Sequence, residues 1–371
     1  MTVLLLSDAR SIHTVRWANA LTDSGCKIHL VYFPNHENVS GDLDPRVGLH
    51  PLPFLDGRVH KLLNAWALHR IYRKIRPDVV NAHYASNYGT LMRTAHLRHT
   101  VLSVWGRDIY DIPYEGWRSM YVIRKNLKSA QLLASTSHCM AEQTRRVLGR
   151  NVKVAITPFG VDLNRFTPPL SKKNTKEIVI GCIKTLEEKY GMKYLIQAVR
   201  LLIDHLSETG NSDVSSCIRC RIYGSGSQRK ELEELITQLN LSDSVRLMGS
   251  VPHNQVPDVL SQMDIFCVAS VLDSESFGVA AVEASAMALP VVVSDVDGFR
   301  EVVEDKVTGL IVPRQDPAAM AHALEQLVLN PNLRTELGVQ GRRRVEALYN
   351  WEDNVKQMLQ VYDSASKGEH K

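Results

Sequence analysis

The chain has 371 residues, of which 44% are hydrophobic and 23% charged, a balance that excludes a disordered chain and a small disulfide-stapled scaffold. The net charge of +4 is unevenly distributed, because residues 1–170 hold 22 basic and 12 acidic residues and residues 171–371 hold 22 basic and 28 acidic residues. No apolar run approaches the roughly 18 residues of a spanning helix, so we expect no integral membrane protein.

The length indicates two or three domains. The first residues, MTVLLLSDARSIH, contain an apolar run too short for a signal peptide, so we expect a cytoplasmic chain. Its six cysteines are scattered, which agrees with reduced thiols. Cys217 and Cys220 form a C-x-x-C pair, but no second pair lies at matching spacing, and we expect no metal site. The basic first half predicts an anionic partner, which we expect not to be a nucleic acid.

Strands and helices alternate along the first half of the chain. Apolar runs predict strands over 2–8, 26–33, 77–83, 100–106, 131–137 and 153–160, and helical periodicity predicts helices over 11–25, 58–76, 87–99, 119–130 and 139–149. This alternation predicts βαβ units and a parallel sheet covered on both faces.

A Pro-, Ser- and Lys-rich segment, 167–177, is typical of a linker, and a second alternating series follows it. Strands are predicted over 177–183, 217–224, 244–249, 264–270 and 290–295, and helices over 192–206, 228–241, 256–263, 277–288, 318–329 and 333–349. The predicted α/β fold is two doubly wound, Rossmann-like domains, 1–168 and 169–345, with a C-terminal helix, 346–371, that packs back towards the first domain. Ligands bind beyond the carboxyl ends of such strands, so we expect the active site in a cleft between facing domains.

The strongest chemical signal is the segment from Glu275 to Glu283. We expect the backbone N–H groups of Ser276, Phe277, Gly278 and Val279 to point out of a helix N-terminus, where they and the helix dipole suit a diphosphate. The acceptor-only carboxylate of Glu283, in the first turns of that helix, suits the vicinal hydroxyls of a ribose. The alternative is a capped helix with two solvated glutamates.

Two further segments of the second half have the same character. Lys184 and Lys189 follow a predicted strand, and two cations at its carboxyl end could neutralise a nucleotide diphosphate that leaves. Gly224 and Gly226 end another strand, where a nucleotide can lie against bare backbone. The alternatives are solvated lysines and a simple G-x-G turn.

Together these segments resemble the retaining family 4 glycosyltransferases, which have the GT-B fold, over nearly the whole chain. PFGVDLNRF at 158–166 is similar to the family's P-N-G-V-D-x-x-x-F motif, with Phe159 in place of Asn, and GCIKTLEEKYGMKYLIQA resembles its G-R-L-x-x-x-K-G-x-x-x-L-I-x-A block. YGSGSQR resembles its G-x-G-x-x-R, and the segment from Glu275 to Glu283 resembles its paired-glutamate motif.

The resemblance implies a retaining transfer of a sugar from a nucleotide-diphosphate donor, with UDP as the expected nucleotide, and no metal or other cofactor. It implies that Glu275 contacts donor-sugar hydroxyls, that residues 276–279 and Gly224 bind the donor, that Glu283 holds the ribose, and that Lys184 and Lys189 bind the leaving diphosphate. The expected acceptor is lipid-linked or a saccharide, as in the synthesis of surface polysaccharide.

The first domain departs from the family pattern. SDARSIHTVRW replaces a Gly-Gly loop, and its Arg10, His13 and Arg16 could dock an acceptor phosphate at the first helix N-terminus. VWGRD replaces H-G-x-D, so Trp105 stands where His is usual. His83, at the carboxyl end of another predicted strand, is the preferred histidine of the catalytic face, with a structural role as its alternative.

The acid-free segment Arg58–Arg76 reads as a basic amphipathic helix that carries Trp66. Such a helix is a candidate to lie on an anionic membrane surface, which would place the chain on the inner face of the cell membrane, or it packs as an ordinary surface helix. The alternative to a transferase is an isomerase of the same fold, similar to an epimerase of UDP-N-acetylglucosamine. A nucleotide-sugar-binding protein without turnover is a third possibility.

Overall fold

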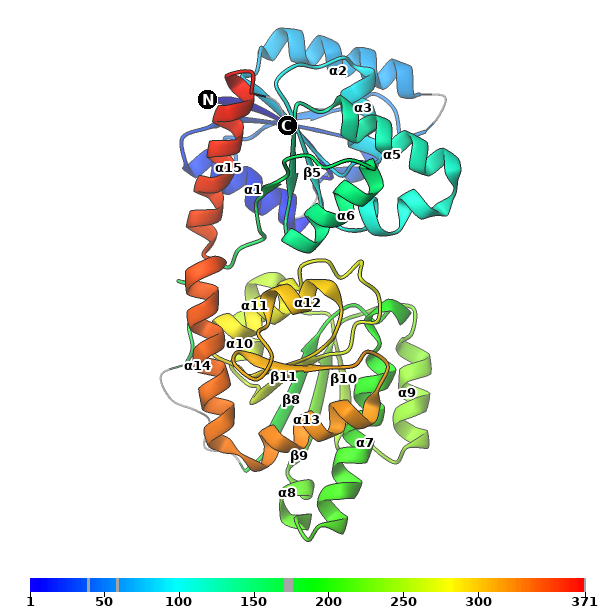
Figure 1. Ribbon diagram of the computed structural model, residues 1–371, viewed down its shortest axis with the longest axis vertical. Helices are drawn as coiled ribbons and strands as arrows, with labels where there is room; N and C mark the ends of the chain where they lie inside the picture. The colour runs from blue at the N-terminus through cyan, green and yellow to red at the C-terminus, as the bar shows by residue number, and fades with distance from the viewer. Residues whose placement is uncertain (39–40, 58–59, 170–175, 370–371) are drawn as a thin grey trace. The chain divides into compact units, whose positions relative to one another are not determined.

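The computed structural model describes residues 1–38, 41–57, 60–169 and 176–369, and Figure 1 shows its elements in chain order. The chain divides into two compact units. Unit 1 is Met1–Phe159 with Glu352–Lys371, and unit 2 is Gly160–Trp351. The expected boundary at residue 168 therefore lies inside unit 2, where Val161 forms an isolated parallel bridge with Asn350.

Unit 1 is built on a seven-stranded parallel sheet in the order β3-β2-β1-β4-β5-β6-β7. Its strands are β1 (Thr2–Leu6), β2 (Lys27–Tyr32), β3 (Gly48–Pro51), β4 (Val79–His83), β5 (Thr100–Val104), β6 (Leu132–Ser135) and β7 (Ala155–Ile156). Its α-helices are α1 (Ile12–Asp23), α2 (Lys61–Ile75), α3 (Asn87–Thr94), α4 (Arg107–Tyr110), α5 (Trp117–Ser129), α6 (His138–Leu148) and, from the last segment, α15 (Trp351–Ser366).

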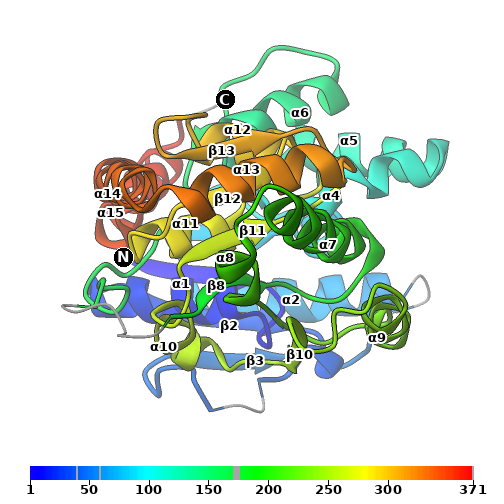
Figure 2. The same ribbon diagram turned by 90° about the horizontal axis from the view of Figure 1, so that it is seen from below.

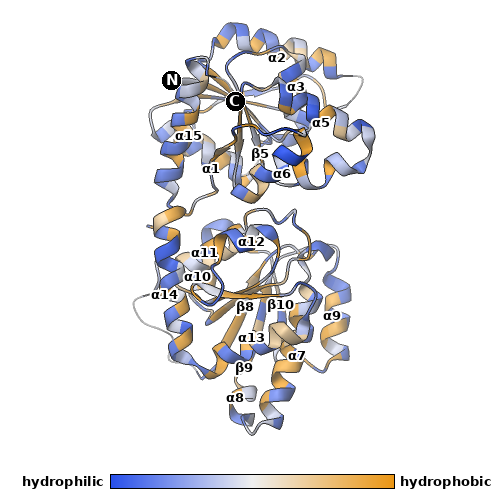
Figure 3. Cartoon of the chain, in the orientation of Figure 1, coloured by the Kyte–Doolittle hydropathy of each residue, from blue (hydrophilic) through white to orange (hydrophobic). Residues whose placement is uncertain are grey.

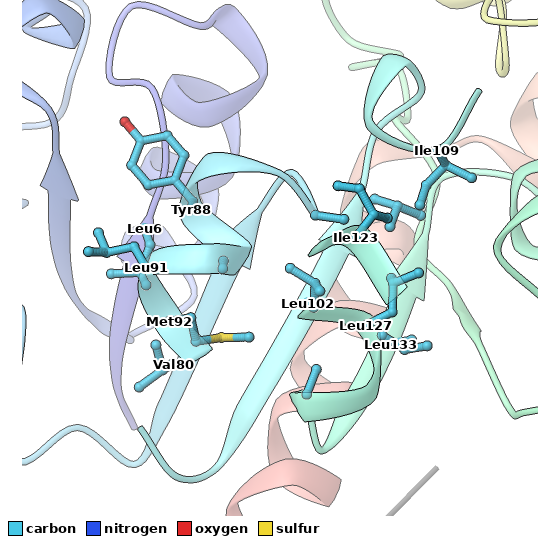
Figure 4. Close-up of a cluster of buried hydrophobic side chains, with 14 of the residues drawn as sticks. Leu6, Val80, Tyr88, Leu91, Met92, Leu102, Ile109, Ile123, Leu127 and Leu133 are labelled. Atoms are coloured by element: carbon cyan, nitrogen blue, oxygen red, sulfur yellow. The ribbon is translucent and has the colours of Figure 1, made fainter. Parts of the chain in front are cut away.

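The core of unit 1 forms because its central strands are mostly apolar and are buried on both faces. β4 and β5 are buried along their whole length, as expected for parallel strands covered by helices on each side. On one face, Leu91 and Met92 of α3 and Ile123 and Leu127 of α5 pack over Val80 and Leu102 of the sheet (Figure 4).

The segment after unit 2 completes unit 1. In α15 the fully buried hydroxyl of Tyr362 accepts a hydrogen bond of 2.8 Å from the Asn81 amide of β4. The Nδ1 atom of His99 and the side-chain amide of Gln131 both contact the Ala365 carbonyl oxygen, at 3.0 and 2.9 Å. These polar contacts fix α15 against the sheet of unit 1.

Unit 2 holds a six-stranded parallel sheet in the order β10-β9-β8-β11-β12-β13. Its strands are β8 (Ile178–Ile183), β9 (Ile218–Tyr223), β10 (Val245–Gly249), β11 (Ile265–Val268), β12 (Val291–Ser294) and β13 (Gly309–Val312). Its α-helices are α7 (Met192–Glu208), α8 (Ser212–Ser216), α9 (Arg229–Gln238), α10 (Val256–Leu260), α11 (Val279–Ala286), α12 (Asp297–Val302), α13 (Pro317–Leu329) and α14 (Pro331–Leu348).

Helix α7 and helix α13 lie side by side against this second sheet (Figure 2). The hydropathy colouring agrees, because β8 is strongly hydrophobic whereas the helices carry both hydrophobic and hydrophilic residues (Figure 3). The α/β, doubly wound architecture predicted from the alternation is confirmed in both units.

Each sheet reverses its strand order at one place, between β1 and β4 in unit 1 and between β8 and β11 in unit 2. The two connections that leave such a pair run to opposite sides, which opens a crevice at the carboxyl ends of the strands. These two places are therefore where a ligand site is expected in each unit.

Candidate active site

Lys184 and Glu275 meet at the reversal point of unit 2. Lys184 directly follows β8, and Glu275 lies in the loop after β11. The ammonium group forms an ion pair with the carboxylate, although the two side chains are only 14% and 10% exposed. The Ser270 hydroxyl donates a further hydrogen bond of 3.4 Å to the same carboxylate. A paired, nearly buried acid and base stand where the fold leaves room for a ligand.

Tyr190 brings both predicted lysines together. The Nζ atoms of Lys184 and Lys189 lie 4.6 and 4.9 Å from the centroid of its ring. Burial lowers the pKa of Lys184, but the neighbouring Glu275 carboxylate and Tyr190 outweigh burial, and the net pKa is raised. The Lys184 ammonium is therefore charged at neutral pH.

Hydrogen bonds and ion pairs to neighbouring loops hold the loop that carries Glu275 in place. The Arg314 guanidinium bonds to the carboxylates of Asp273 and Asp295, at 3.0 and 3.2 Å. The backbone of Asp297 donates to Asp273 at 3.1 Å. A side chain at Gly298 would lie 2.2 Å from the Glu275 carbonyl oxygen, so only glycine lets α12 approach this closely. Glu275 thus sits on a braced loop.

Helix α11 begins directly after that loop. Gly278 precedes it with a left-handed backbone (φ 82°), and a Cβ atom there would lie 2.6 Å from the Phe299 ring. Ser276 and Phe277 are buried at 4% and 3% exposure, whereas Val279, the first residue of α11, is half-buried. The predicted helix start is confirmed, and its first turn contains no acidic residue.

Glu283 has a partner that the sequence did not indicate. Its carboxylate lies 2.9 Å from His253 Nε2, and the residue is 6% exposed. The Arg165 guanidinium donates to the His253 carbonyl oxygen at 2.5 Å. One feature of the sequence could have indicated this contact: His253 follows β10 by a few residues and therefore lies at the same edge of the sheet as Lys184.

Gly224 faces the protein itself. A Cβ atom there would lie 1.9 Å from the Lys184 carbonyl oxygen, and the backbone φ is 149°. A Cβ atom at Gly226 would lie 2.3 Å from the Leu186 carbonyl oxygen. These glycines therefore let the loop after β8 pack against the loop after β9, and the predicted contact of Gly224 with a donor stays a prediction.

In unit 1, His83 lies at the corresponding reversal point. It ends β4, is 1% exposed, and its Nδ1 atom lies 2.9 Å from the Ser7 hydroxyl, which follows β1. Its ring packs on Trp105, with centroids 4.2 Å apart. Burial, with a smaller effect of His13, lowers the pKa of His83 to about 3, so the imidazole is neutral.

The predicted residues His13 and Trp105 join the same aromatic cluster. His13 stacks on Phe159 at 4.0 Å, and Trp105 meets Phe159 edge-on at 5.3 Å. Arg10 forms an ion pair of 2.8 Å with Asp8. Because Asp8 offsets the charge of Arg10, the loop is less cationic than its sequence predicts. Arg16 is half-buried on α1.

Asp108 positions Trp105. Its fully buried carboxylate accepts backbone hydrogen bonds from Ala85 at 2.7 Å, from Trp105 at 3.1 Å and from Gly106 at 3.0 Å. Burial raises the pKa of Asp108 to about 6, against the opposing effect of these backbone donors. The carboxylate ties the loop after β5 to the loop after β4.

Helix α2 accounts for most of the predicted basic segment, although Arg58 lies outside the described residues. Ala65 and Leu68 are buried, whereas Leu62, Leu63 and Trp66 are 72%, 50% and 61% exposed. Arg70, Arg73 and Lys74 are also exposed, and the Arg70 guanidinium lies 4.8 Å from the Trp66 ring centroid. The apolar residues of the helix are therefore split between the core and the surface.

Among the described residues there is no cluster of three or more His, Cys, Asp or Glu side chains that could hold a metal ion, and Cys217 and Cys220 are free thiols. The same residues form no helix that is both long and apolar enough to cross a bilayer.

Comparisons with known proteins find similarity to glycosyl transferases over most of the chain. Residues 165–344 match the family model of glycosyl transferases group 1, and residues 2–137 match that of glycosyl transferase 4-like proteins. A D-inositol 3-phosphate glycosyltransferase of Xylanimonas cellulosilytica is 30% identical over 321 residues, which cover 78% of this chain and 72% of that protein.

Solved structures share the fold. Sucrose-phosphate synthase of Thermosynechococcus elongatus superposes with a TM-score of 0.82 at 21% identity, over 98% of each chain. Anabaena Alr3699/HepE in complex with UDP superposes with a TM-score of 0.78 at 15% identity, over 98% of this chain and 100% of that one. The predicted GT-B fold is confirmed.

Proposed function

The chain belongs to the group 1 glycosyl transferases, and from this premise we propose that it transfers a sugar from a UDP-sugar to an acceptor with retention at the anomeric carbon. The observation that carries the proposal is the nearly buried pair of Lys184 and Glu275 at the carboxyl ends of β8 and β11. Membership in a family of transferases favours transfer over the isomerase and over binding without turnover.

In the proposal the ion pair of Lys184 and Glu275 separates when the donor binds, and each side chain then contacts the donor. The Lys184 ammonium binds the leaving diphosphate, and Lys189 lies near the same Tyr190 ring. Both cations offset the negative charge that develops on the diphosphate as its bond to the sugar breaks. The Glu275 carboxylate then accepts hydrogen bonds from sugar hydroxyls. The braced loop keeps Glu275 in place throughout, so the exchange requires little reorganisation.

Glu283 and His253 are proposed to receive the ribose. The carboxylate is acceptor-only and suits two neighbouring hydroxyls, and His253 orients it from the other side. The backbone amides from Ser276 to Val279, which lead into α11, are proposed to face the diphosphate. UDP as the nucleotide is supported by HepE, a protein of the same fold that was solved in complex with UDP.

The acceptor is assigned to unit 1. The cluster of His13, His83 and Trp105 lies at the carboxyl edge of its sheet. Because His83 is buried and neutral, we assign it the positioning of Trp105. Trp105 is half-buried, and its exposed part is the surface offered to an acceptor ring. Lipid-linked or saccharide acceptors of surface polysaccharide both fit such an aromatic platform.

The exposed stripe of α2 supports a peripheral location at an anionic membrane. Leu62, Leu63 and Trp66 supply apolar contact, and Arg70 and Arg73 supply charge, each worth up to about 1 kcal/mol near an anionic surface. Wild type is expected to sediment with phosphatidylglycerol vesicles at low salt and not with phosphatidylcholine vesicles. A variant with Arg70, Arg73 and Lys74 changed to Glu should stay in the supernatant. Wild type in the supernatant throughout would contradict the proposal.

The test of the reaction is a panel of labelled UDP- and GDP-sugars incubated with polyprenyl diphosphate or oligosaccharide acceptors, followed by proton NMR of the product. Transfer from a UDP-sugar with an unchanged anomeric configuration is expected, and EDTA should leave the rate unchanged. Lys189→Ala should lower kcat by about 100-fold, while the exposed neighbour variant Glu188→Gln should not. A product of inverted configuration would overturn the retaining mechanism.

A further inference from the structure

Arg314 connects three loops at the carboxyl edge of the second sheet. It lies two residues after β13, the edge strand of unit 2, and Asp295 directly follows β12. Val271 and Asp273 belong to the loop after β11, which also carries Glu275. The three strands are neighbours in the order β11-β12-β13, so their loops leave the sheet side by side. One side chain that starts from the outer loop therefore reaches the loop of Glu275.

The guanidinium group of Arg314 uses every hydrogen-bond donor that it has. Its Nε atom donates to the Asp295 carboxylate at 3.2 Å. Its Nη1 atom donates to the Val271 carbonyl oxygen at 3.4 Å and to the Asp273 carboxylate at 3.3 Å. Its Nη2 atom donates to the Asp273 carboxylate at 3.0 Å and to the Asp295 carbonyl oxygen at 2.9 Å. Because a guanidinium presents its donors in one rigid plane, these hydrogen bonds fix the three loops relative to one another.

The hydrogen bonds of this network join charged groups. Hydrogen bonds to Asp273 and Asp295 raise the pKa of Arg314 and outweigh burial. Burial raises the pKa of Asp295, but hydrogen bonds from Arg314 and Arg300 outweigh burial, and its pKa is lowered. Arg314 and Asp295 are therefore both ionised at neutral pH, and hydrogen bonds between ionised groups are about twice as strong as those between neutral groups.

Arg314 reaches Glu275 through the backbone of its loop. Asp273 lies two residues before Glu275, and the Glu275 amide donates to the Leu272 carbonyl oxygen at 3.1 Å, which closes a turn. The guanidinium holds the residue on each side of Leu272, namely Val271 by its carbonyl oxygen and Asp273 by its carboxylate. In the described part of the chain, no hydrogen bond or ion pair joins Arg314 to Glu275 itself. The effect of Arg314 on the Glu275 carboxylate therefore passes through the position of this turn.

The position of the turn matters most when the donor is bound. In the structure, the Lys184 ammonium holds the Glu275 carboxylate in an ion pair. In the proposed reaction this ion pair separates, and the carboxylate then meets the sugar without that partner. From this point its place depends on the turn, and hence on Arg314. An error of about 1 Å in the placement of a reacting group can cost about 100-fold in rate.

We propose that Arg314 is a positioning residue of the transfer reaction, which holds the turn of Glu275 where its carboxylate meets the donor sugar. This inference rests on the proposed function, because it needs the contact between Glu275 and the sugar hydroxyls. The planar array of donors is the decisive property, since three loops are held at once. A lysine keeps the charge but supplies its donors from a single atom, so Arg314→Lys is expected to behave as Arg314→Met does.

Steady-state kinetics and UDP binding, both measured on the full chain, test this role. Arg314→Met and Arg314→Lys should each lower kcat at least about tenfold with the UDP-sugar that wild type uses. Both variants should bind UDP within about twofold of wild type, because UDP lacks the sugar that Glu275 contacts. The matched control is Arg300→Met, which should keep the wild-type kcat. Arg300 also donates to the Asp295 carboxylate, at 3.1 Å, but among the described residues it bonds to Asp295 alone.

A double variant separates positioning from a general loss of structure. Glu275→Gln removes the carboxylate that Arg314 places, so in that background Arg314→Met should lower kcat by less than about twofold more. Two losses that multiply would show that Arg314 acts independently of Glu275 and would overturn the inference. Added ethylguanidinium should restore part of the kcat of Arg314→Ala, whereas ethylammonium should not, because only the first ion has the planar donors. Equal effects of the two ions would contradict the inference.

The outcomes distinguish this inference from the proposed function. If Glu275→Gln lowers kcat and Arg314→Met does not, the inference alone is wrong. If Glu275→Gln keeps the wild-type kcat, the role proposed for Glu275 is wrong, and the inference fails with it. Hydrogen exchange of residues 271–277 checks the physical cause, since protection there should fall in Arg314→Met and stay unchanged in Arg300→Met.

Discussion

Glu275→Gln is expected to destabilise unit 2 while leaving its shape intact. The substitution removes one charge and keeps the volume, so Lys184 is left as a cation with 14% of its side chain exposed and without its carboxylate partner. Loss of one member of a fully buried pair costs about 3–5 kcal/mol. Because both side chains keep some exposure, we expect a loss of about 2–4 kcal/mol in the free energy of unfolding.

Hydrogen exchange read by mass spectrometry is the suitable assay, since the two units need not unfold together. Protection should fall in the segments around β8 and β11 and stay unchanged in unit 1. Glu188→Gln, an exposed glutamate four residues after Lys184, is the matched control. The double variant Lys184→Met with Glu275→Gln should lose less than Glu275→Gln alone, because it leaves no unpaired charge. Equal protection in Glu275→Gln and Glu188→Gln would refute the reasoning.

Three further outcomes follow from the site. Gly278→Ala should cost about 2–4 kcal/mol, from the left-handed backbone and the 2.6 Å approach to the Phe299 ring, as measured by urea unfolding. With a pKa of about 6, Asp108 keeps its proton between about pH 4 and 6 in the folded protein, whereas the unfolded chain loses it. This residue therefore makes the free energy of unfolding fall as the pH rises through that range, and the fall should disappear in Asp108→Asn. The pKa of His83, about 3, has the opposite effect, because the unfolded chain binds a proton below about pH 6.5 and the folded protein does not. The free energy of unfolding therefore falls as the pH drops from about 6.5 towards 3, and His83→Gln should reduce this fall.

The fold was predictable because its signals are local. Buried parallel strands produce continuous apolar runs, and the helices between them produce the helical period of apolar residues in the sequence. The edge strands β3 and β13 were not predicted, since four residues that include Gly48 and Pro51, or that begin with Gly309, give too little apolar pattern. The sequence also did not indicate the division of the chain after Phe159, because a bridge such as Val161 with Asn350 joins residues far apart in the sequence.

The candidate site was predictable as a set of residues but not as a set of pairs. Strand ends place Lys184, Glu275 and His83 at the correct edge of each sheet. The sequence could not indicate that Lys184 pairs with Glu275, or that Glu283 pairs with His253, because those contacts depend on the order of the strands. The close approach of Gly224 to the Lys184 carbonyl oxygen is a further contact that the sequence could not indicate, and the contact of Gly224 with a donor stays a prediction.

The assignment of α15 to unit 1 has a consequence for synthesis on the ribosome. Unit 2, residues 160–351, emerges before the segment 352–371 that completes unit 1. Until Tyr362 arrives, the Asn81 amide lacks the hydroxyl that it bonds in the native state. The sheet of unit 1 therefore stays incomplete on one face while unit 2 is synthesised and folds. Chaperones can bind the exposed face during this period. Removal of residues 352–371 should extend this state indefinitely, and the truncated protein should accumulate with unit 2 folded and unit 1 open to proteolysis.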